Sequence, residues 1–309
     1  MVEIFLRTLP FFALIGLGYW AGRSRFFSQE ATAYLTKFVF YFALSAMIFR
    51  FAANLSFAEV FNGRLVLGYL AGTAAIYALA TLVAFFRGLD IPTAAIEAQC
   101  AVIGNVGFLG LPMLIQLFGE AAVGPIMLVL ATDLVVFSSL VVMLINGGRD
   151  GRLKLATLRA MGLGLVRNPM IVSIVLGLGW SALALPVPGP MNDFVTILGG
   201  AATPGALFAI GASLAGKSAE RVQIAGWLSI CKLALHPAAV AVGVLLLFPL
   251  DSFSATVVIT AAALPVAGNV YMLAQHYGVA PHRVSATILL STVASIVTVP
   301  VVIAWLTGS

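Results

Sequence analysis

The chain has 309 residues, of which 61% are hydrophobic and 9% are charged, and its formal net charge is +5. A soluble domain carries about a quarter charged residues, so this composition excludes an ordinary soluble protein and indicates an integral membrane protein. The basic residues lie at the ends of apolar runs rather than in a patch with aromatic residues, which argues against a nucleic-acid partner.

Ten apolar runs are long enough to cross a lipid bilayer as helices, which takes about 20 residues each. They cover residues 4–22, 31–52, 63–86, 93–118, 123–146, 169–185, 191–215, 223–248, 254–277 and 280–306. The first run lacks a basic leading segment and a small-residue cleavage site, so we expect a span rather than a removed signal peptide. Cys100 and Cys231 fall within spans, where we expect them to pack as small hydrophobes. The sequence therefore predicts an all-α integral membrane protein of ten transmembrane helices.

The orientation follows from lysine and arginine, which are retained on the cytoplasmic side of a membrane. One side of the predicted spans holds 13 of the 16 basic residues: Arg23, Arg25, Lys37, Arg87, Arg149, Arg152, Lys154, Arg159, Arg167, Lys217, Arg221, Lys232 and Arg283. The other side holds Arg7, Arg50 and Arg64. We therefore expect both termini to be extracytoplasmic, and residues 147–168 to form a cytoplasmic loop of a multi-pass protein in the cell inner (plasma) membrane. Lys37 and Lys232 lie inside their helices near the cytoplasmic end, where a long side chain can snorkel.

The chain resembles itself at a shift of 159 residues. "PMLIQLFG" at 112–119 lies over "YMLAQHYG" at 271–278, and the shift also places Gly18 on Gly177 and Phe49 on Phe208. This predicts two repeats, residues 1–146 and 169–309, joined by the 147–168 loop. Five spans in each repeat would place the second copy upside down in the membrane, as in many secondary transporters.

Two spans contain residues that break helices. Span 4 reads "GNVGFLGLPML" at 104–114, and the shift lays it over "ALPVAGNVY" in span 9. Proline removes a backbone donor and glycine weakens a helix, so both spans should unwind there. Unpaired backbone in hydrocarbon is costly, so such a break survives only where it is buried in protein or lines a cavity. The helix that starts after each break then directs a partial positive charge at the membrane midplane, which favours an anion.

These two breaks carry the predicted substrate site. Its residues are Asn105, Gly107, Gly110, Pro112, Pro265, Gly268, Asn269 and Tyr271. Asn105 and Asn269 supply amides without the cost of a buried charge. No arginine or lysine lies at the centre of either broken span, so we expect helix dipoles and these amides to meet the anion's charge. The free N–H groups should begin near Leu111–Met113 and Val270–Tyr271.

Three further polar residues are candidates for coupling or support. Asp133 lies midway along span 5, and an acid at that depth is a functional candidate because an ionised side chain is expensive there. The alternative is a carboxylate that is paired structurally or faces a wet cavity. Gln116 and Gln275 coincide under the shift and can contact substrate or hydrogen-bond across helices. His236 precedes Pro237 in span 8, where we expect it to satisfy a kinked backbone.

The stretches "GNVGFLGLPML", "TPGALFAIGASLAG" and "LPVAGNVYMLAQHYG" resemble the auxin efflux carrier family over nearly the whole chain. This family includes the plant PIN carriers and bacterial relatives, and is related in fold to the bile-acid/sodium symporters. The resemblance implies two inverted five-helix repeats in which broken helices 4 and 9 cross. It also implies a scaffold of helices 1, 2, 6 and 7 and an elevator-like movement of helices 3–5 and 8–10.

The resemblance further implies secondary active transport of a small organic anion, such as a mono- or dicarboxylate or an auxin-like acid, by a homodimer in the lipid bilayer. We expect no cofactor and no metal, and the sequence leaves a proton, sodium or no coupling ion open. The alternatives are a sodium-coupled symporter of larger organic anions, a passive channel and an intramembrane enzyme. Against an enzyme, we find no HExxH, no paired aspartates and no cluster among the three histidines.

Overall fold

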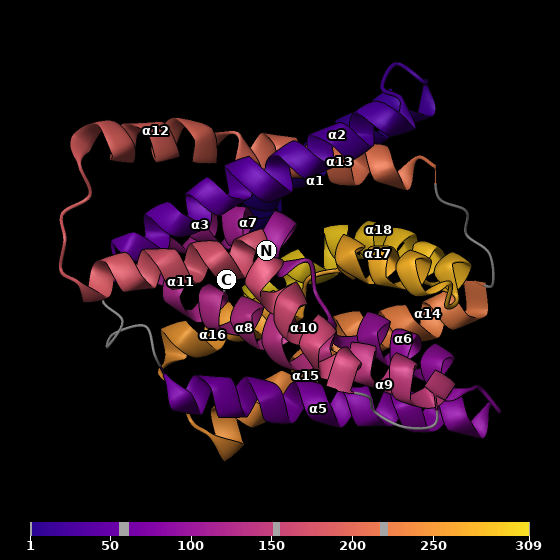
Figure 1. The fold of residues 1–309 in the computed structure, drawn as a ribbon. Helices are drawn as coiled ribbons and strands as arrows, with labels where there is room; N and C mark the ends of the chain where they lie inside the picture. Colours follow the sequence, from indigo (N-terminus) through magenta and orange to yellow (C-terminus); the bar gives the residue numbers. More distant parts are fainter. Residues whose placement is uncertain (1, 56–61, 151–154, 217–221, 309) are drawn as a thin grey trace.

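The computed structural model describes residues 2–55, 62–150, 155–216 and 222–308, and within these ranges the backbone is helical apart from short connections and one isolated β-bridge (Figure 1). The helices before residue 168 are α1 (Val2–Arg23), α2 (Gln29–Phe38), η1 (Val39–Ala43), α3 (Leu44–Ala53), α5 (Gly63–Phe86), α6 (Ile91–Val102), η2 (Val106–Gly110), α7 (Leu111–Phe118), η3 (Glu120–Ala122), α8 (Val123–Thr132), η4 (Asp133–Phe137), α9 (Ser138–Asp150) and α10 (Leu155–Arg167). Those after it are α11 (Pro169–Ala182), α12 (Gly189–Gly200), α13 (Ala202–Leu214), α14 (Val222–Ile230), η5 (Cys231–Leu235), α15 (His236–Val242), η6 (Gly243–Leu247), α16 (Ser252–Ala262), α17 (Gly268–Tyr277) and α18 (Pro281–Thr307).

Within the described ranges, seven continuous helical segments are long and apolar enough to cross a membrane. They are Val2–Arg23, Gln29–Ala53, Gly63–Phe86, Glu120–Arg149, Gly189–Leu214, Val222–Leu247 and Pro281–Thr307. An eighth is added if the bent pair Met161–Arg167 and Pro169–Ala182 counts as one span. The chain is therefore a multi-pass membrane protein, and α5 coincides with the predicted span 63–86.

The predicted spans 4 and 9 are each divided into two shorter helices. Residues 103–105 separate α6 from η2, and residues 263–267 separate α16 from α17. The first break differs from the prediction, because the helix restarts at Val106, five residues before Leu111. Pro112 lies in the first turn of α7, where the missing N–H is tolerated, and the wider π turn of η2 precedes it. The second helix restarts at Gly268, close to the predicted start.

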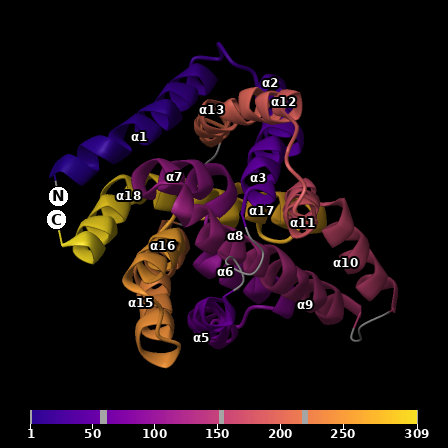
Figure 2. The same cartoon turned by 90° about the vertical axis from the view of Figure 1, so that its left-hand side faces the viewer.

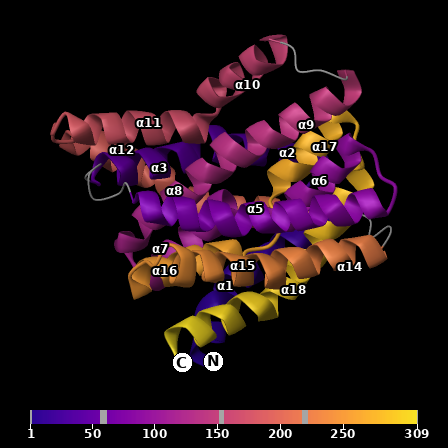
Figure 3. The same ribbon diagram turned by 90° about the horizontal axis from the view of Figure 1, so that it is seen from below.

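The segment predicted as the 147–168 loop contains more helix than expected. Helix α9 continues to Asp150, and α10 then leads to α11 with a bend of 64°. Asn168 ends the bend, because its side-chain Oδ1 accepts the N–H of Met170 at 3.0 Å and so caps α11. Figure 3 shows α10 beside α9 and α11 at one end of the molecule. Residues 151–154 of this segment lie outside the described part of the chain.

The helices pack in two groups. In the first, α1 packs against α13 and α3 packs against α11 and α12; in the second, α5 packs against α6 and α15, and α14 packs against α18 (Figures 1 and 2). Glycine permits the closest approach in the first group, since a Cβ on Gly18 would lie 2.1 Å from the carbonyl oxygen of Phe208. A Cβ on Gly211 of α13 would likewise overlap the carbonyl oxygen of Ile15 of α1. Small residues at helix contacts are typical of membrane proteins, where backbones must approach closely.

The two chain ends lie side by side in all three ribbon views, at the start of α1 and the end of α18. These two helices also contact one another directly. A pair of adjacent ends is expected if both lie on the same side of the membrane.

Candidate functional site

The two breaks cross each other and are joined by backbone hydrogen bonds. The N–H of Asn105 donates to the carbonyl oxygen of Pro265 at 2.8 Å, and the N–H of Ala267 donates to the carbonyl oxygen of Ile103 at 3.1 Å. Gly104 and Val266 form an antiparallel bridge between these bonds. Each break thus gives one donor and one acceptor to the other, which satisfies backbone groups that no helix pairs. We call residues 103–105 and 263–267 the crossover.

Ser291 of α18 holds the second break of the crossover by a hydrogen bond. Its Oγ accepts the N–H of Val266 at 3.2 Å, and both residues are buried. The same hydroxyl donates to the carbonyl oxygen of Ile288 in its own helix at 3.2 Å. A third helix therefore positions the second break.

A cavity of about 430 Å³ adjoins the crossover, within the size range of small-molecule sites. Its polar lining includes Asn105 and Asn269, one from each break, together with Asp133 from the start of η4. Phe40, Leu134 and Met272 are among its apolar lining residues. It extends from the crossover to Gly164 and Leu165 of α10 and to His276 and Tyr277 at the end of α17.

Two helix N-termini meet this cavity, and neither has a side-chain cap. Helix η2 follows Asn105 and helix α17 follows Ala267, both of which line the cavity. The first N–H groups of a helix have no intrahelical partner, and the helix dipole adds partial positive charge there. Such a helix end is a favourable place for an anion.

Two buried oxygen atoms of residues that line the cavity have no hydrogen-bond partner in the described part of the chain: Oδ1 of Asn269 and Oδ2 of Asp133. The other carboxylate oxygen of Asp133, Oδ1, accepts the hydroxyl of Tyr69 in α5 at 2.8 Å. Asp133 is 3% exposed. A buried polar atom is nearly always paired, so these two oxygen atoms are left for a group that enters the cavity.

The other predicted site residues divide into two sets. Gly107 and Gly268 line the cavity, whereas Gly110, Pro112, Pro265 and Tyr271 do not. Pro265 takes part through its backbone oxygen, and Gly110 packs under the crossover, where an added Cβ would lie 2.5 Å from Cδ1 of Leu264. The side chains of Gln116 and Gln275 are exposed and lie outside the cavity lining, so the structure does not bring them to the crossover.

Lys232 is the functional candidate that the sequence analysis misplaced. Its side chain does not snorkel to the membrane surface but is 0% exposed. Its Nζ donates to the carbonyl oxygen of Ala262, the last residue of α16. A Cβ added at Gly104 would lie 3.2 Å from Nζ. A lysine from span 8 therefore reaches the crossover, although neither broken span carries one.

His236 lies between Lys232 and α5. Its Nδ1 is 3.2 Å from Nζ of Lys232 and 3.2 Å from the carbonyl oxygen of Ala262, while its Nε2 is 3.0 Å from Oγ1 of Thr73. The carbonyl belongs to α16 rather than to a kink in its own helix. The histidine therefore contacts the backbone of a neighbouring helix rather than that of its own kink, and it joins a network of side chains.

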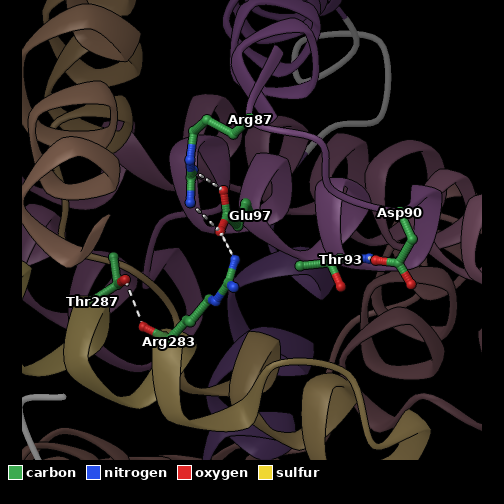
Figure 4. Close-up of polar contacts among 6 residues, drawn as sticks. All are labelled: Arg87, Asp90, Thr93, Glu97, Arg283 and Thr287. Carbon is green, nitrogen blue, oxygen red and sulfur yellow. Dashed lines mark hydrogen bonds and ion pairs between the residues drawn. The ribbon is translucent and has the colours of Figure 1, made fainter. Parts of the chain in front are cut away.

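A second cluster of buried charge surrounds Glu97 of α6 (Figure 4). Its Oε2 is 2.7 Å from Nη1 of Arg87 at the end of α5, and its Oε1 is 2.5 Å from Nη1 of Arg283 in α18. Both carboxylate oxygens are therefore paired. Glu97 is 1% exposed, whereas both arginines retain contact with solvent. The cluster ties three helices together at the end of the molecule where most basic residues lie.

Comparison with known proteins finds similar proteins over nearly the whole length of the chain. A family model described as "Membrane transport protein" matches residues 3–303. A protein of Rhizobium meliloti (strain 1021) named "Putative malonate transporter" is 30% identical over 305 residues, which cover 97% of this chain and 94% of that protein. A protein of Escherichia coli (strain K12) named "Uncharacterized transporter YfdV" is 25% identical over 302 residues, or 94% of each chain.

Proposed function

The chain belongs to the family of membrane transport proteins, as its resemblance to the auxin efflux carriers predicted, and we propose that it is a secondary transporter of a small organic anion. The observation that carries this proposal is the cavity at the crossover. Two uncapped helix N-termini and two asparagine amides meet there in a chain of a transport family. Membership of this family also favours a carrier over an enzyme.

The electrostatics of the cavity support an anionic substrate. Each helix N-terminus contributes about 0.3–1 kcal/mol toward a negative charge, and up to about 2 kcal/mol where it is partly buried. The amides of Asn105 and Asn269 add hydrogen-bond donors once they rotate to present their NH2 groups. Lys232 places its amino group behind Gly104, so dipoles and amides do not act alone as the sequence had suggested.

We propose ten spans in two inverted repeats, and one packing detail supports this. Gly18 approaches the carbonyl oxygen of Phe208, and Gly177 approaches that of Phe49. The 159-residue shift places Gly18 on Gly177 and Phe49 on Phe208, so the same helix contact is made twice with the partners exchanged. The reciprocal bonds of the crossover support the same twofold relation.

The proposed mechanism is an elevator-like movement of the second group of helices against the first, in a homodimer of the inner membrane with both termini outside. The cavity extends to α10 and to the end of α17, where Nη2 of Arg149 donates to the carbonyl oxygen of Tyr277. Basic residues gather at the cytoplasmic end of membrane proteins, so we assign this arrangement to the inward-facing state. Broken helices at the midplane suit such alternating access.

Malonate, malate and an indole-acetate-like acid are the proposed substrate candidates. The cavity volume suits an anion of this size, and the name of the Rhizobium relative favours malonate as the first probe. The test is counterflow of radiolabelled malonate and malate in proteoliposomes that contain the purified protein. We expect saturable uptake that is accelerated by unlabelled anion inside the vesicles. A flux that neither saturates nor shows counterflow would indicate a channel, and no flux for any carboxylate would reject the proposal.

A further inference from the structure

Asp133 presents a problem for a cavity that binds anions. Its carboxylate lines the same cavity as both asparagines and both helix N-termini, and it is almost fully buried. Two negative charges placed together in a poorly solvated site repel one another strongly. An anion can therefore enter beside Asp133 only if one of the two charges is neutralised.

A series of side-chain contacts connects Asp133 to the amine of Lys232. Tyr69 donates its hydroxyl to Oδ1 of Asp133 at 2.8 Å, and Thr73 lies one turn further along α5, close to that hydroxyl. Thr73 and Nε2 of His236 are 3.0 Å apart, and Nδ1 of His236 is 3.2 Å from Nζ of Lys232. The chain of contacts thus runs without a gap from the cavity to the crossover.

The hydrogen bonds between these side chains can all be donated in one direction, from Lys232 toward Asp133. A charged lysine has only donors, so Nδ1 of His236 accepts from Lys232 and Nε2–H is left to donate to Thr73. Thr73 can then donate to Tyr69, which donates to Asp133. This direction stabilises positive charge at Lys232 and negative charge at Asp133. Hydrogen bonds aligned in this way also polarise one another.

Asp133 and Lys232, the first and last residues of this series of contacts, occupy similar positions in their helices. Asp133 is the first residue of η4 and Lys232 is the second residue of η5, and both segments are single π turns within longer helices. π turns inside α-helices occur frequently at functional sites. The other titratable groups that line this cavity in the described part of the chain are His276 and Tyr277 of α17, while Glu97 of α6 is held by its two arginines.

We propose that Asp133 takes up one proton when the anion binds, so that the carrier moves a proton and an anion together. The proton reaches the unpartnered Oδ2 from solvent through cavity water: an O–H bond of hydronium breaks, the Oδ2–H bond forms, and a neutral water molecule is left. In the empty site, Asp133 and Lys232 compensate one another; in the loaded site, protonated Asp133 leaves Lys232 to compensate one negative charge of the substrate. The new Oδ2–H donates to a carboxylate oxygen of the anion. This inference rests on the proposed function and specifies its coupling ion.

Lys232 also argues against sodium as that ion. Cations bind at broken helices through the carbonyl groups at the end of a half-helix. Here the carbonyl oxygen of Ala262, at the end of α16, already accepts from Nζ of Lys232. The ammonium group therefore occupies the position that a coupling cation would take at this half-helix.

The decisive test measures proton uptake on binding. Purified protein in weakly buffered detergent solution is titrated with malonate, malate or indole-acetate at a pH where the acid is fully ionised, and a pH indicator reports the protons taken up. We expect one proton per bound anion for the wild type and none for Asp133→Asn or Lys232→Met. In Lys232→Met, Asp133 should already hold its proton before the anion binds. One proton per anion in Asp133→Asn would overturn the inference.

A transport assay gives an independent reading. In proteoliposomes, an inside-alkaline pH gradient of one unit should raise malonate accumulation by about tenfold for wild type, because one pH unit and a tenfold ratio are each about 1.4 kcal/mol. Asp133→Asn should exchange anion at a reduced rate and show no response to the gradient. Accumulation driven by a sodium gradient instead of a pH gradient would contradict the proposal.

Two tyrosine variants test whether the side chains between Asp133 and Lys232 take part in coupling. Tyr69→Phe removes the donor to Asp133 and should reduce the response to the pH gradient. Tyr77→Phe changes a buried tyrosine of the same helix whose hydroxyl donates to the carbonyl oxygen of Ala95, and it should respond like wild type. Equal responses of the two variants would show that the chain has no part in coupling. Failure of wild type to bind or exchange any carboxylate would reject the proposed function itself, whereas binding without proton uptake would reject only this inference.

Discussion

Glu97 and Asp133 are both buried carboxylates, but they are paired differently. Glu97 has both oxygens engaged by arginines, whereas Asp133 has one oxygen bonded by Tyr69 and the other buried without a partner among the described residues. A fully paired carboxylate holds helices together, and its loss leaves stranded charges. A half-paired carboxylate has capacity left for a proton or a ligand. The difference indicates a structural role for Glu97 and a functional role for Asp133.

Removal of the fully paired carboxylate should have the largest effect on stability. For Glu97→Ala we expect a loss of about 3 kcal/mol, at the lower end for a broken buried pair because both arginines can still reach solvent. Thermal unfolding in detergent measures this loss. Asp90→Ala is the control, because this exposed carboxylate at the same end of the molecule only caps the N–H of Thr93 (Figure 4). A loss of stability no greater than that of Asp90→Ala would contradict a structural role for Glu97.

The crossover should depend on Ser291. Ser291→Ala leaves the buried N–H of Val266 without an acceptor, so we expect it to cost about 1–3 kcal/mol of stability. Ser295→Ala is the matched control, since this buried serine one turn away bonds only the carbonyl oxygen of Thr292 in its own helix. Thermal unfolding of the two variants compares them directly. Equal losses would mean that α18 does not fix the second break.

An exposed carboxylate offers a third case for the comparison. Asp251 caps α16, where its side chain accepts the N–H of Ser254 at 2.9 Å, and this hydrogen bond lowers the pKa of Asp251. Asp251→Ala should cost about 1 kcal/mol at neutral pH, as for a lost helix cap. Because the pKa is lower in the folded state, the stabilisation by the charge is present above the unfolded pKa and disappears as the pH falls through the folded pKa.

Thermal unfolding from pH 7 into the acid range checks this cap, with Asp251→Asn as the uncharged variant that can still accept the hydrogen bond. The difference between wild type and Asp251→Asn should shrink toward zero in acid. A difference that is constant with pH would show that the charge of Asp251 contributes nothing.

The smallest effect on stability is expected at Gly268. A Cβ there would meet nothing within 4 Å, and the residue lines the cavity at the start of α17. Gly268→Ala should therefore be neutral or raise stability by about 0.4–1 kcal/mol, because it restricts the unfolded chain. The methyl group should nevertheless weaken anion binding. Thermal unfolding with and without malonate separates the two effects, and unchanged malonate binding would show that the substrate does not contact this helix end.

The sequence predicted an all-helical membrane protein because long apolar runs leave few alternatives in a membrane. Within the described ranges seven helices, or eight with the bent pair, are long and apolar enough to span, and the division into ten spans stays a prediction. It also predicted that spans 4 and 9 break, since proline and glycine weaken helices wherever they lie. The position of the first break was wrong because the π turn Val106–Gly110 and the bonds of Asn105 to the second break are long-range features. Pro112, the residue that most strongly predicted a break, lies in the first turn of helix α7.

The structure brings three of the predicted residues to one cavity, and it adds a residue that the prediction left out; their binding of substrate stays a prediction. Asn105, Asn269 and Asp133 line one cavity, as their depth in the spans suggested. Lys232 could not be placed, because its distance from the end of span 8 is compatible with snorkelling and only the packing of η5 against α5, α6 and α18 buries it. A lysine deep in a predicted span, four residues before a histidine, is the signal that could have identified it.

The most direct test of the central claim is anion binding by wild type, Asn105→Ala and Asn269→Ala. Scintillation proximity or thermal shift with malonate, malate and indole-acetate should show binding to wild type that each variant weakens by roughly 5- to 150-fold, as expected for a lost buried amide worth about 1–3 kcal/mol. Asn146→Ala, in which the lost amide donates only to the carbonyl oxygen of Val142 in its own helix, should bind like wild type. A carboxylate that binds equally well to all four proteins would show that the crossover is a structural feature and that the substrate site lies elsewhere.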